Sequence, residues 1–367
     1  MNLLYSDIED QLRSSVRDLL TARAQPSAIL ARCESEQPHD LELWRTLAGE
    51  VGVSALHVPE ELGGQGASAR EVAVVLEELG RSVAPVPFLG SAVLATTALL
   101  GVEPTGPARE LLDALGTGGS VAALAISLAT MPGSPFPSGV EATGDGLRGA
   151  VRAVADAAAA DVLVVPAVGP DGPALHVVPV AQAGVVVTPA VSLDLTRPIA
   201  DISFDGATST PLPGAAESAL DSALWTATAL LASEQVGLAE WCLTTTVAYL
   251  KDRHQFGRPV GSFQALKHRL ADLFGELALA RASARHAADS VGGEDARVSA
   301  LLANSLCSEV AVHAAEECVQ LHGGIGMTWE HPAHLYLKRA KADQIALGTP
   351  GRLRALLAPL VDLPGPR

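Results

Sequence analysis

A short polar motif near the C-terminal third of the chain, Arg-His-Gln-Phe-Gly beginning at Arg253, could bind a nucleotide diphosphate. The guanidinium of Arg253 can hold a diphosphate through two parallel hydrogen bonds, and Gln255 supplies amide donors and an acceptor. Phe256 offers a flat apolar face. Phe263 and Gln264 follow at the start of the next expected helix, where free backbone N–H groups attract anions. Taken alone, these residues fit a capped corner between two helices with a surface arginine at least as well.

A second motif, Gln-Leu-His-Gly-Gly-Ile-Gly, begins at Gln320. Gln320 and Leu321 end a long helical pattern, and Gly323, Gly324 and Gly326 let backbone N–H groups approach a ligand without interference from a Cβ. A single glycine would be enough to end a helix, so three exceed that need. The motif follows a helix rather than a strand, which excludes the Rossmann fingerprint. Together, the two motifs predict a clamp for a dinucleotide cofactor.

Long helices must position both motifs. The segment 216–252 has no proline and one glycine, and helical patterns continue over 262–291 and 294–322. The connections between these segments are short, which predicts antiparallel neighbours in a helical bundle. We therefore predict that 214–367 forms a helical domain that carries the clamp.

Two further regions precede the bundle. Residues 1–116 repeat apolar side chains at helical spacing and predict a helical domain. Residues 117–213 carry short β-branched runs separated by proline, glycine and aspartate, as in a small barrel or sandwich. The clearest runs lie at 161–165, 174–178 and 184–188, and 131–139 is predicted to be an irregular surface loop.

Composition narrows the class of protein. The 367 residues carry a net charge of −16 without a Lys/Arg cluster, so a nucleic-acid partner is not expected. No basic and apolar leader or uninterrupted membrane span of about 20 residues is apparent, which favours a cytoplasmic protein with no membrane partner. The four cysteines lack metal-binding spacing and are expected to be buried, reduced thiols. The histidines 313, 322, 331 and 334 do not repeat a metal pattern, so no zinc site is expected.

The chain resembles the acyl-CoA dehydrogenase family over nearly its whole length. The segment 52–66, from Gly-Val-Ser-Ala to Gly-Gly-Gln-Gly, is similar to that family's N-terminal loop. The first motif, extended over 253–264 and on to Asp272, resembles its C-terminal signature. So does Gly-Gly-Ile-Gly-Met-Thr at 323–328, with Glu330 and Pro332. The implied fold has an N-terminal helical domain, a middle β-barrel or sandwich domain and a C-terminal four-helix bundle.

The resemblance implies FAD as cofactor, a dimer or tetramer, and α,β-dehydrogenation of an acyl-CoA thioester. A carboxylate would remove the α-proton while a hydride passes from the β-carbon to flavin N5. In the family each FAD is shared, its ADP half lying on one subunit and its flavin ring mainly on the β-domain of the other. The cofactor-binding residues implied here are Arg253, Gln255, Phe256, Phe263, Gln264, Gln320, Leu321, Gly323, Gly324 and Thr349.

Both positions from which the family takes its catalytic base are apolar in this chain. One precedes the Gly-Thr pair near the C-terminus and is Leu347. The other lies 26 residues before Arg253 and is Ala227, followed by Thr228. Neither Leu347 nor Ala227 can accept a proton at any pH.

The part of the family pattern that holds the flavin ring also differs. The family's Thr-Glu-Pro and Gly-Ser-Asp are absent from 121–139. Its ring-stacking Trp-Ile-Thr corresponds to Ala-Val-Ala at 153–155, and no tryptophan occurs between Trp44 and Trp225.

These departures favour a non-catalytic subunit of a heteromeric acyl-CoA dehydrogenase, which keeps the ADP clamp for the flavin of a catalytic partner. That partner would bind most of the acyl-CoA, bulky or steroid side chains included, and pass electrons to an electron-transfer flavoprotein or another acceptor. Two alternatives stay open, a homo-oligomer with a displaced base and a flavin-free scaffold. The nearby acids expected as surface or helix-capping groups, and considered as displaced bases, are Glu234, Glu240, Glu330 and Asp343. Among the basic residues, His268 and Arg269 are expected at an interface or solvated face, and Arg339 and Lys341 as last-turn helix charges.

Overall fold

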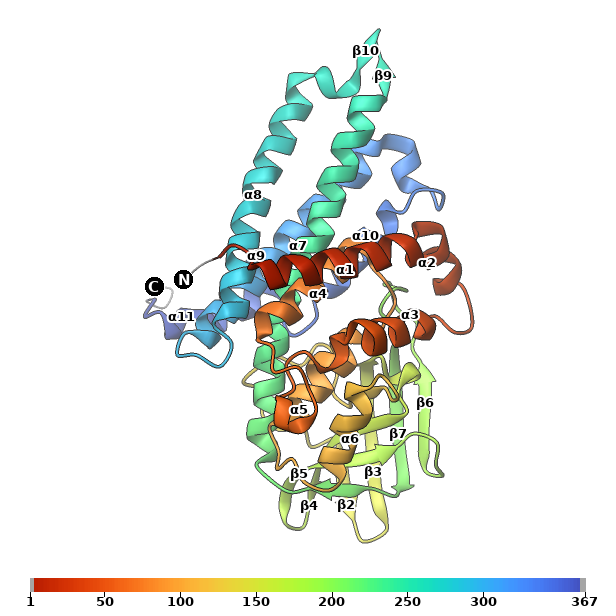
Figure 1. Ribbon diagram of the computed structural model, residues 1–367, viewed down its shortest axis with the longest axis vertical. Coiled ribbons are helices and arrows are strands. Elements are labelled where there is room, and N and C mark those ends of the chain that lie inside the picture. Colours follow the sequence, from red (N-terminus) through yellow and green to blue (C-terminus); the bar gives the residue numbers. More distant parts are fainter. Residues whose placement is uncertain (1–2, 364–367) are drawn as a thin grey trace.

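The computed structural model describes residues 3–363 and separates into helical, sheet and helical regions along the chain (Figure 1). The central helix α7, Ala216–Asp252, runs through the length of the molecule and packs against both other regions. At one end of the molecule it projects beyond the rest together with α8, Gln264–Asp289. The predicted limits between domains, after 116 and after 213, stay predictions.

The N-terminal region consists of helices with defined caps. Ser6 and Glu9 form a capping box on the first helix, and Ser68 and Glu71 form another on the fourth. The elements are α1 Asp7–Arg23, α2 Pro26–Cys33, α3 Leu41–Arg45, η1 Thr46–Val51, η2 Val53–Ala55, η3 Glu60–Leu62, α4 Ala69–Ser82, η4 Phe88–Ala95, α5 Thr96–Leu100 and α6 Pro107–Gly116.

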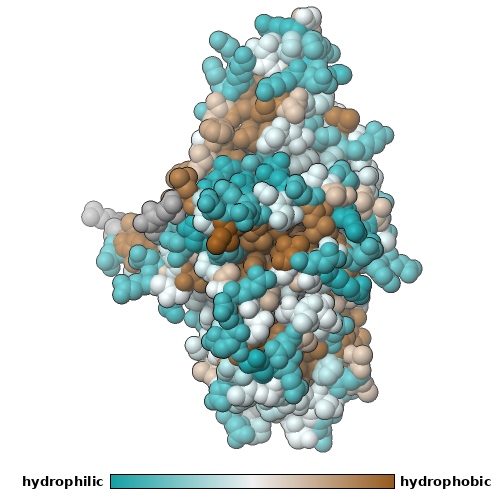
Figure 2. Space-filling view, viewed as in Figure 1, coloured by the Kyte–Doolittle hydropathy of each residue, from teal (hydrophilic) through white to brown (hydrophobic). Residues whose placement is uncertain are grey.

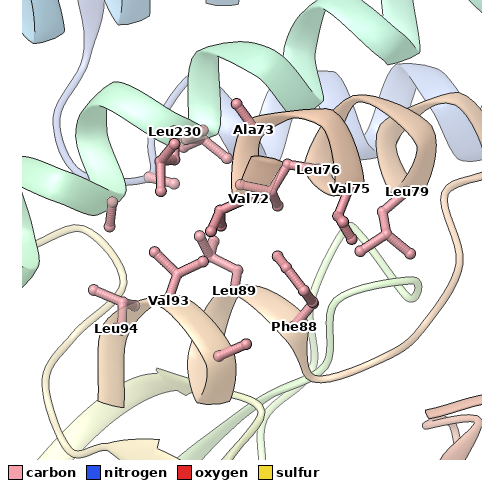
Figure 3. Packing of buried hydrophobic residues seen from close by; sticks show 14 of the residues in the cluster. Val72, Ala73, Val75, Leu76, Leu79, Phe88, Leu89, Val93, Leu94 and Leu230 are labelled. Atoms are coloured by element: carbon pink, nitrogen blue, oxygen red, sulfur yellow. The ribbon is translucent and has the colours of Figure 1, made fainter. Parts of the chain in front are cut away.

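This region packs against α7 through apolar side chains and through a close backbone contact at two glycines. Side chains of α4 and η4 point toward one another across a buried layer that Leu230 of α7 closes (Figure 3). A Cβ on Gly237 would stand 1.8 Å from the carbonyl oxygen of Glu77, and one on Gly80 would stand 2.0 Å from that of Glu234. Glycine at both positions therefore allows the backbones of α4 and α7 to touch.

The middle region is one mixed eight-stranded sheet with its own small apolar core. Its order is β6-β7-β3-β2-β4-β5-β8, with β1 pairing in parallel to β4 and most other pairs antiparallel. The three predicted runs are confirmed as β4, β5 and β6, and 131–139 lacks regular structure as predicted. The elements are β1 Ala122–Leu124, β2 Val140–Thr143, β3 Gly146–Ala155, η5 Ala157–Ala159, β4 Val162–Gly169, β5 Gly172–Pro179, β6 Val185–Pro189, β7 Ile199–Ala207 and β8 Thr210–Leu212.

The C-terminal helices confirm the predicted bundle. The predicted segment 216–252 is α7, 262–291 becomes α8, and 294–322 becomes α9, Ala296–His322. The remaining elements are β9 His254–Gln255, β10 Arg258–Pro259, η6 Val260–Ser262, η7 Gly323–Met327, α10 Ala333–Asp343 and α11 Pro350–Leu360. The stretch Ala296–Met327 is long and apolar enough to cross a membrane, but 72% of its most apolar window is buried inside the protein, as in the core helix of a globular domain. All four cysteines are buried and free, as predicted.

Candidate functional site

The first motif forms the tip of the projecting α7–α8 hairpin (Figure 1). The helix ends at Asp252 and is followed by its C-cap residue Arg253, whose N–H donates to the carbonyl of Tyr249 at 2.8 Å and whose own carbonyl accepts from Val260 at 2.7 Å. Phe256 and Gly257 join β9 to β10 as a two-residue turn, and both have positive φ, 53° and 73°. Such a turn matches the twist of a hairpin, but the left-handed conformation costs a phenylalanine about 1–2 kcal/mol.

The side chains at the tip are open to an external ligand. Phe256 is 90% exposed and meets Phe263 edge to face at 6.2 Å between ring centroids. The guanidinium of Arg258 covers the Phe263 ring at 3.9 Å, whereas Arg253 has no ion pair among the described residues. No side chain caps the N-terminus of α8 at Gln264, so its first N–H groups are available to an anion.

The second motif lies at the end of α9, and its three glycines differ in whether the chain's own conformation or packing requires glycine there. Gly323 has φ 63°, which favours glycine whatever the surrounding space. A Cβ on Gly326 would stand 2.6 Å from the carbonyl oxygen of Val319, so packing within the chain requires glycine there. A Cβ on Gly324 would meet nothing within 4 Å and its φ is not positive. The chain itself does not need glycine at 324, as expected if a ligand approaches that backbone closely.

A ring contact brings the two motifs to the same end of the bundle. Tyr249, one turn before Arg253, stacks on His322, the last residue of α9, with 4.4 Å between ring centroids. Apolar side chains around both motifs are exposed, namely Phe256, Ile325, Met327 and Trp329. In the space-filling view, apolar surface also gathers on the projecting hairpin (Figure 2), where Phe274 and Leu279 of α8 are exposed.

The tenth predicted cofactor residue lies elsewhere. Thr349 is the N-cap of α11, which Figure 1 places away from the hairpin tip. It therefore belongs with the loop that carries Leu347 and not with the two motifs. The other nine predicted residues lie on the tip or on the end of α9, where Gln320 is exposed and Leu321 is half-buried.

Both family base positions are closed off inside the protein. Leu347 and Ala227 are each 0% exposed. Leu347 has φ 56° and its N–H donates to the carbonyl of Leu128 at 2.8 Å, which fixes the loop against the sheet region. A Cβ on Gly348 would stand 2.9 Å from both Leu353 and Met131, which share a small apolar cluster. Packed side chains fill the space beside Gly348.

The segment matched to the flavin-ring site lines a small apolar cavity of about 320 Å³. Ala153 has φ 53°, its N–H donates to Asp201 at 2.9 Å, and its carbonyl accepts from Leu128 at 2.9 Å. Ala153 places only a methyl group at this position. The remaining lining is mainly aliphatic, from Leu128, Ala129, Val191, Leu193, Ile199, Ile345 and Ala346. Within residues 3–363, no aromatic side chain lines the cavity.

The structure corrects three expectations about charged residues. Glu234 and Asp343, expected as surface or capping acids, and Arg339, expected as a last-turn charge, are fully buried together. Arg197 donates to Asp343 at 2.5 Å and to Glu234 at 2.6 Å. Arg339 donates to Glu234 at 2.6 Å and to Asp194 at 2.7 Å. No sequence pattern pointed to Arg197 or Asp194, because both lie in an irregular segment before β7 whose partners are distant in the chain.

Two acids of this buried network have opposite pKa shifts. Burial raises the pKa of Glu234, but the guanidiniums of Arg197 and Arg339 outweigh it and hold that pKa below its ordinary value. Burial and the neighbouring Glu234 raise the pKa of Asp343 to about 7. Both carboxyl groups are enclosed and bound to arginines, so they cannot act as displaced bases on an external substrate.

The other candidate acids and cations are accounted for locally. Glu240 lies near Arg81 at 3.8 Å and Arg281 at 3.2 Å, and Glu330 is exposed. Lys341 lies in the last turn of α10, as predicted. Its ammonium donates to Glu316 at 2.8 Å, and Arg269 donates to Glu317 at 2.5 Å.

Comparison with known proteins identifies the family. Residues 6–102 match the acyl-CoA dehydrogenase N-terminal domain, and residues 219–359 match the acyl-CoA dehydrogenase C-terminal domain. The chain belongs to the acyl-CoA dehydrogenase family. This confirms the resemblance seen in the sequence and the expected fold, and FAD is the cofactor of the family.

Similar proteins include members of two-component complexes. Acyl-CoA dehydrogenase IpdE2 of Mycolicibacterium smegmatis is 39% identical over 345 residues, covering 94% of this chain and 96% of the relative. A solved variant of the Tcur3481–Tcur3483 steroid ACAD is 31% identical with a TM-score of 0.84, covering 97% of this chain and 98% of that one. A chain of the ChsE4–ChsE5 complex from Mycobacterium tuberculosis is 29% identical with a TM-score of 0.85, covering 100% of this chain and 100% of that one.

Proposed function

We propose that this acyl-CoA dehydrogenase is the base-lacking subunit of an FAD-dependent heteromer, in which it binds the ADP half of an FAD whose flavin ring lies in a catalytic partner. The proposal rests on one contrast within the chain. It keeps residues that can bind the ADP half of FAD, but it lacks a titratable residue at either base position. Nine of the ten residues proposed for the ADP clamp lie on the hairpin tip or on the end of α9, whereas both base positions are apolar and buried.

The residues of the clamp fit a diphosphate and its nucleoside. Arg253 lies at the tip without an ion pair among the described residues, and α8 begins at Gln264 without a side-chain cap. Gly324 leaves backbone open to close approach. These residues would hold the diphosphate with charge-assisted hydrogen bonds, and the glycine loop would lie against the nucleoside.

The residues on the sheet side do not fit a flavin ring in the same way. Ala153 presents a methyl group where the family stacks an indole, and its backbone already bonds to Asp201 and Leu128. We therefore assign no flavin ring to this chain's own sheet region. When bound, FAD supplies the hydride acceptor for α,β-dehydrogenation of an acyl-CoA thioester. In this proposal the chain's own residues bind and orient only its ADP half.

The partner would be a second acyl-CoA dehydrogenase subunit that contributes the carboxylate base and most of the acyl-CoA site. Similarity to the ChsE4–ChsE5 complex and to the Tcur3481–Tcur3483 steroid ACAD supports a partner of the same fold. The second of these also supports a bulky, steroid-type acyl group as the substrate class. The exposed apolar residues around the clamp, such as Phe256 and Met327, would be covered by the partner.

Flavin stoichiometry tests the proposal. The chain is expressed alone and together with an acyl-CoA dehydrogenase subunit of the same organism that carries the base carboxylate, and bound FAD is measured against protein. We expect one FAD for every two protomers in the complex, and neither stable FAD nor turnover in the lone chain. One FAD per protomer with dehydrogenase turnover by the lone chain would refute the subunit assignment. A complex that forms without any flavin would instead support the scaffold alternative.

A further inference from the structure

A second cavity lies far from the clamp, between the N-terminal helices and the sheet. It encloses about 820 Å³ and is bounded by the connection from α2 to α3 on one side. On the other side lie η5 and the segment that joins β6 to β7. Binding sites for small molecules usually fall between about 300 and 1,000 Å³, so this cavity has the size of a ligand site.

One buried polar pair stands in its wall. His39 lines the cavity with 6% of its surface exposed, and its Nε2 lies 3.1 Å from Oδ1 of Asp156, which is 2% exposed. The other carboxylate oxygen of Asp156 accepts from the N–H of Gly90 at 3.1 Å. A Cβ on Gly90 would stand 2.5 Å from that oxygen, and Asp156 itself has φ 60°. Its two hydrogen bonds, the absence of a side chain at Gly90 and its own left-handed backbone thus hold the carboxylate of Asp156 against the imidazole of His39.

This arrangement determines which ring nitrogen is free. An ionised carboxylate only accepts hydrogen bonds, so Nε2 of His39 must carry the proton that Asp156 accepts. In the neutral ring, Nδ1 is then a bare acceptor. Among the described residues, Nδ1 has no hydrogen-bond partner, and the atom is not fully buried. Nδ1 is therefore accessible from the cavity that His39 lines.

The rest of the wall is mixed: beside its apolar side chains stand the uncharged Ser35, Gln37 and Ser192, and Asp194, which accepts from Arg339 at 2.7 Å. Arg32 lies 3.8 Å from Asp40, and Glu42 accepts from Arg23 at 3.2 Å, so two of the rim charges are paired. One arginine and one glutamate, at 45 and 36, offset each other in net charge. The apolar lining comprises Pro38, Leu41, Ala158, Ala159, Pro189, Ala190, Val191, Leu195, Pro198 and Ile199. Such a wall favours a neutral, mainly apolar occupant over an ion.

We propose that this cavity binds a neutral, largely apolar small molecule through a hydroxyl group that donates to Nδ1 of His39. The site is independent of the FAD clamp, because it shares no residue with it and lies between other elements. Asp156 acts as the positioning residue, since it fixes the tautomer and orientation of the imidazole. Burial of the apolar body supplies most of the affinity, and the hydrogen bond selects for a donor.

A matched pair of fluorescent probes tests the donor requirement on the full chain and on its complex. 1-Hydroxypyrene carries the donor, and 1-methoxypyrene replaces it with an ether that cannot donate. We expect 1-hydroxypyrene to bind about fivefold to tenfold more tightly, the range that one net hydrogen bond gives. Equal affinities, or no binding of either probe, would overturn the proposal without requiring any variant to fold.

Three variants then locate the binding. His39→Phe removes the acceptor at similar size and is expected to abolish the preference for the hydroxyl probe. His268→Gln, on the exposed face of α8, is the matched control and should leave it unchanged. Leu195→Trp fills the cavity and should weaken both probes by more than tenfold. Unchanged binding to Leu195→Trp would place the probes elsewhere, and a preference that persists in His39→Phe would reduce His39 to a structural link between domains.

Discussion

The buried charge network makes a specific prediction for Asp343→Asn. Three carboxylates, Asp194, Glu234 and Asp343, face only two guanidiniums, those of Arg197 and Arg339. With all five groups ionised, the network would carry one uncompensated negative charge inside the protein. Among the residues that the structure describes, Oδ2 of Asp343 has no hydrogen-bond partner, so a proton on that oxygen breaks no hydrogen bond of the network. Burial and, after it, the charge of the neighbouring Glu234 raise the pKa of Asp343 to about 7.

The sign of the effect on stability follows from that shift. The pKa of Asp343 rises from 3.8, its ordinary value, to about 7 in the folded protein. The folded state therefore binds a proton that the unfolded state releases. The stabilisation that this proton gives to the folded state is complete below about pH 4 and is lost as the pH rises through 7. Between pH 5 and pH 8 the loss amounts to about 3 kcal/mol. Asparagine resembles the protonated acid at every pH. The free energy of unfolding of Asp343→Asn should therefore not show the loss between pH 5 and pH 8 that Asp343 causes in the wild type.

The assay is urea unfolding of the wild-type chain and Asp343→Asn at pH 5, 6, 7 and 8. We expect similar free energies of unfolding at pH 5 and a more stable variant at pH 8, by about 3 kcal/mol at most. Glu309→Gln is the control, because Glu309 forms an exposed pair with Arg354 and should change stability by less than about 1 kcal/mol. Parallel pH profiles for the wild type and Asp343→Asn would show that the network does not hold a proton on Asp343.

Three further predictions concern the clamp and its support. Arg253→Ala should weaken flavin retention by the complex about tenfold or more, measured by flavin absorbance after gel filtration, whereas Lys267→Ala on the same hairpin should not. Gly324→Val should leave the melting temperature of the lone chain unchanged yet lower flavin retention, while Gly326→Ala should lower the melting temperature because its Cβ would stand 2.6 Å from a carbonyl oxygen. A thermally destabilised Gly324→Val would mean that the chain's own packing requires that glycine. Gly237→Ala should cost several kcal/mol, seen in urea unfolding, because its Cβ would stand 1.8 Å from a backbone oxygen of α4.

Local patterns in the sequence were sufficient for the elements and the motifs. The absence of proline from 216–252 predicted α7 to the residue, and β-branched runs predicted β4, β5 and β6. These features depend on neighbours in the chain, through helix propensity, strand alternation and turn-forming residues. The loss of both bases was equally visible, because Leu347 and Ala227 lack a titratable group whatever surrounds them.

Only the tertiary structure decided which charged groups meet and which glycines are needed. Arg197 and Asp343 are 146 positions apart, and His39 and Asp156 are 117 apart. No periodicity links such residues, so the sequence alone places Asp343 at the surface or at a helix cap and assigns His39 no role. Packing between segments that are distant in the chain sets the environment of these residues. It excludes water and so strengthens the electrostatic interaction within each pair. In the same way, the contact between Tyr249 and His322 joined two motifs that the sequence could only place on separate helices.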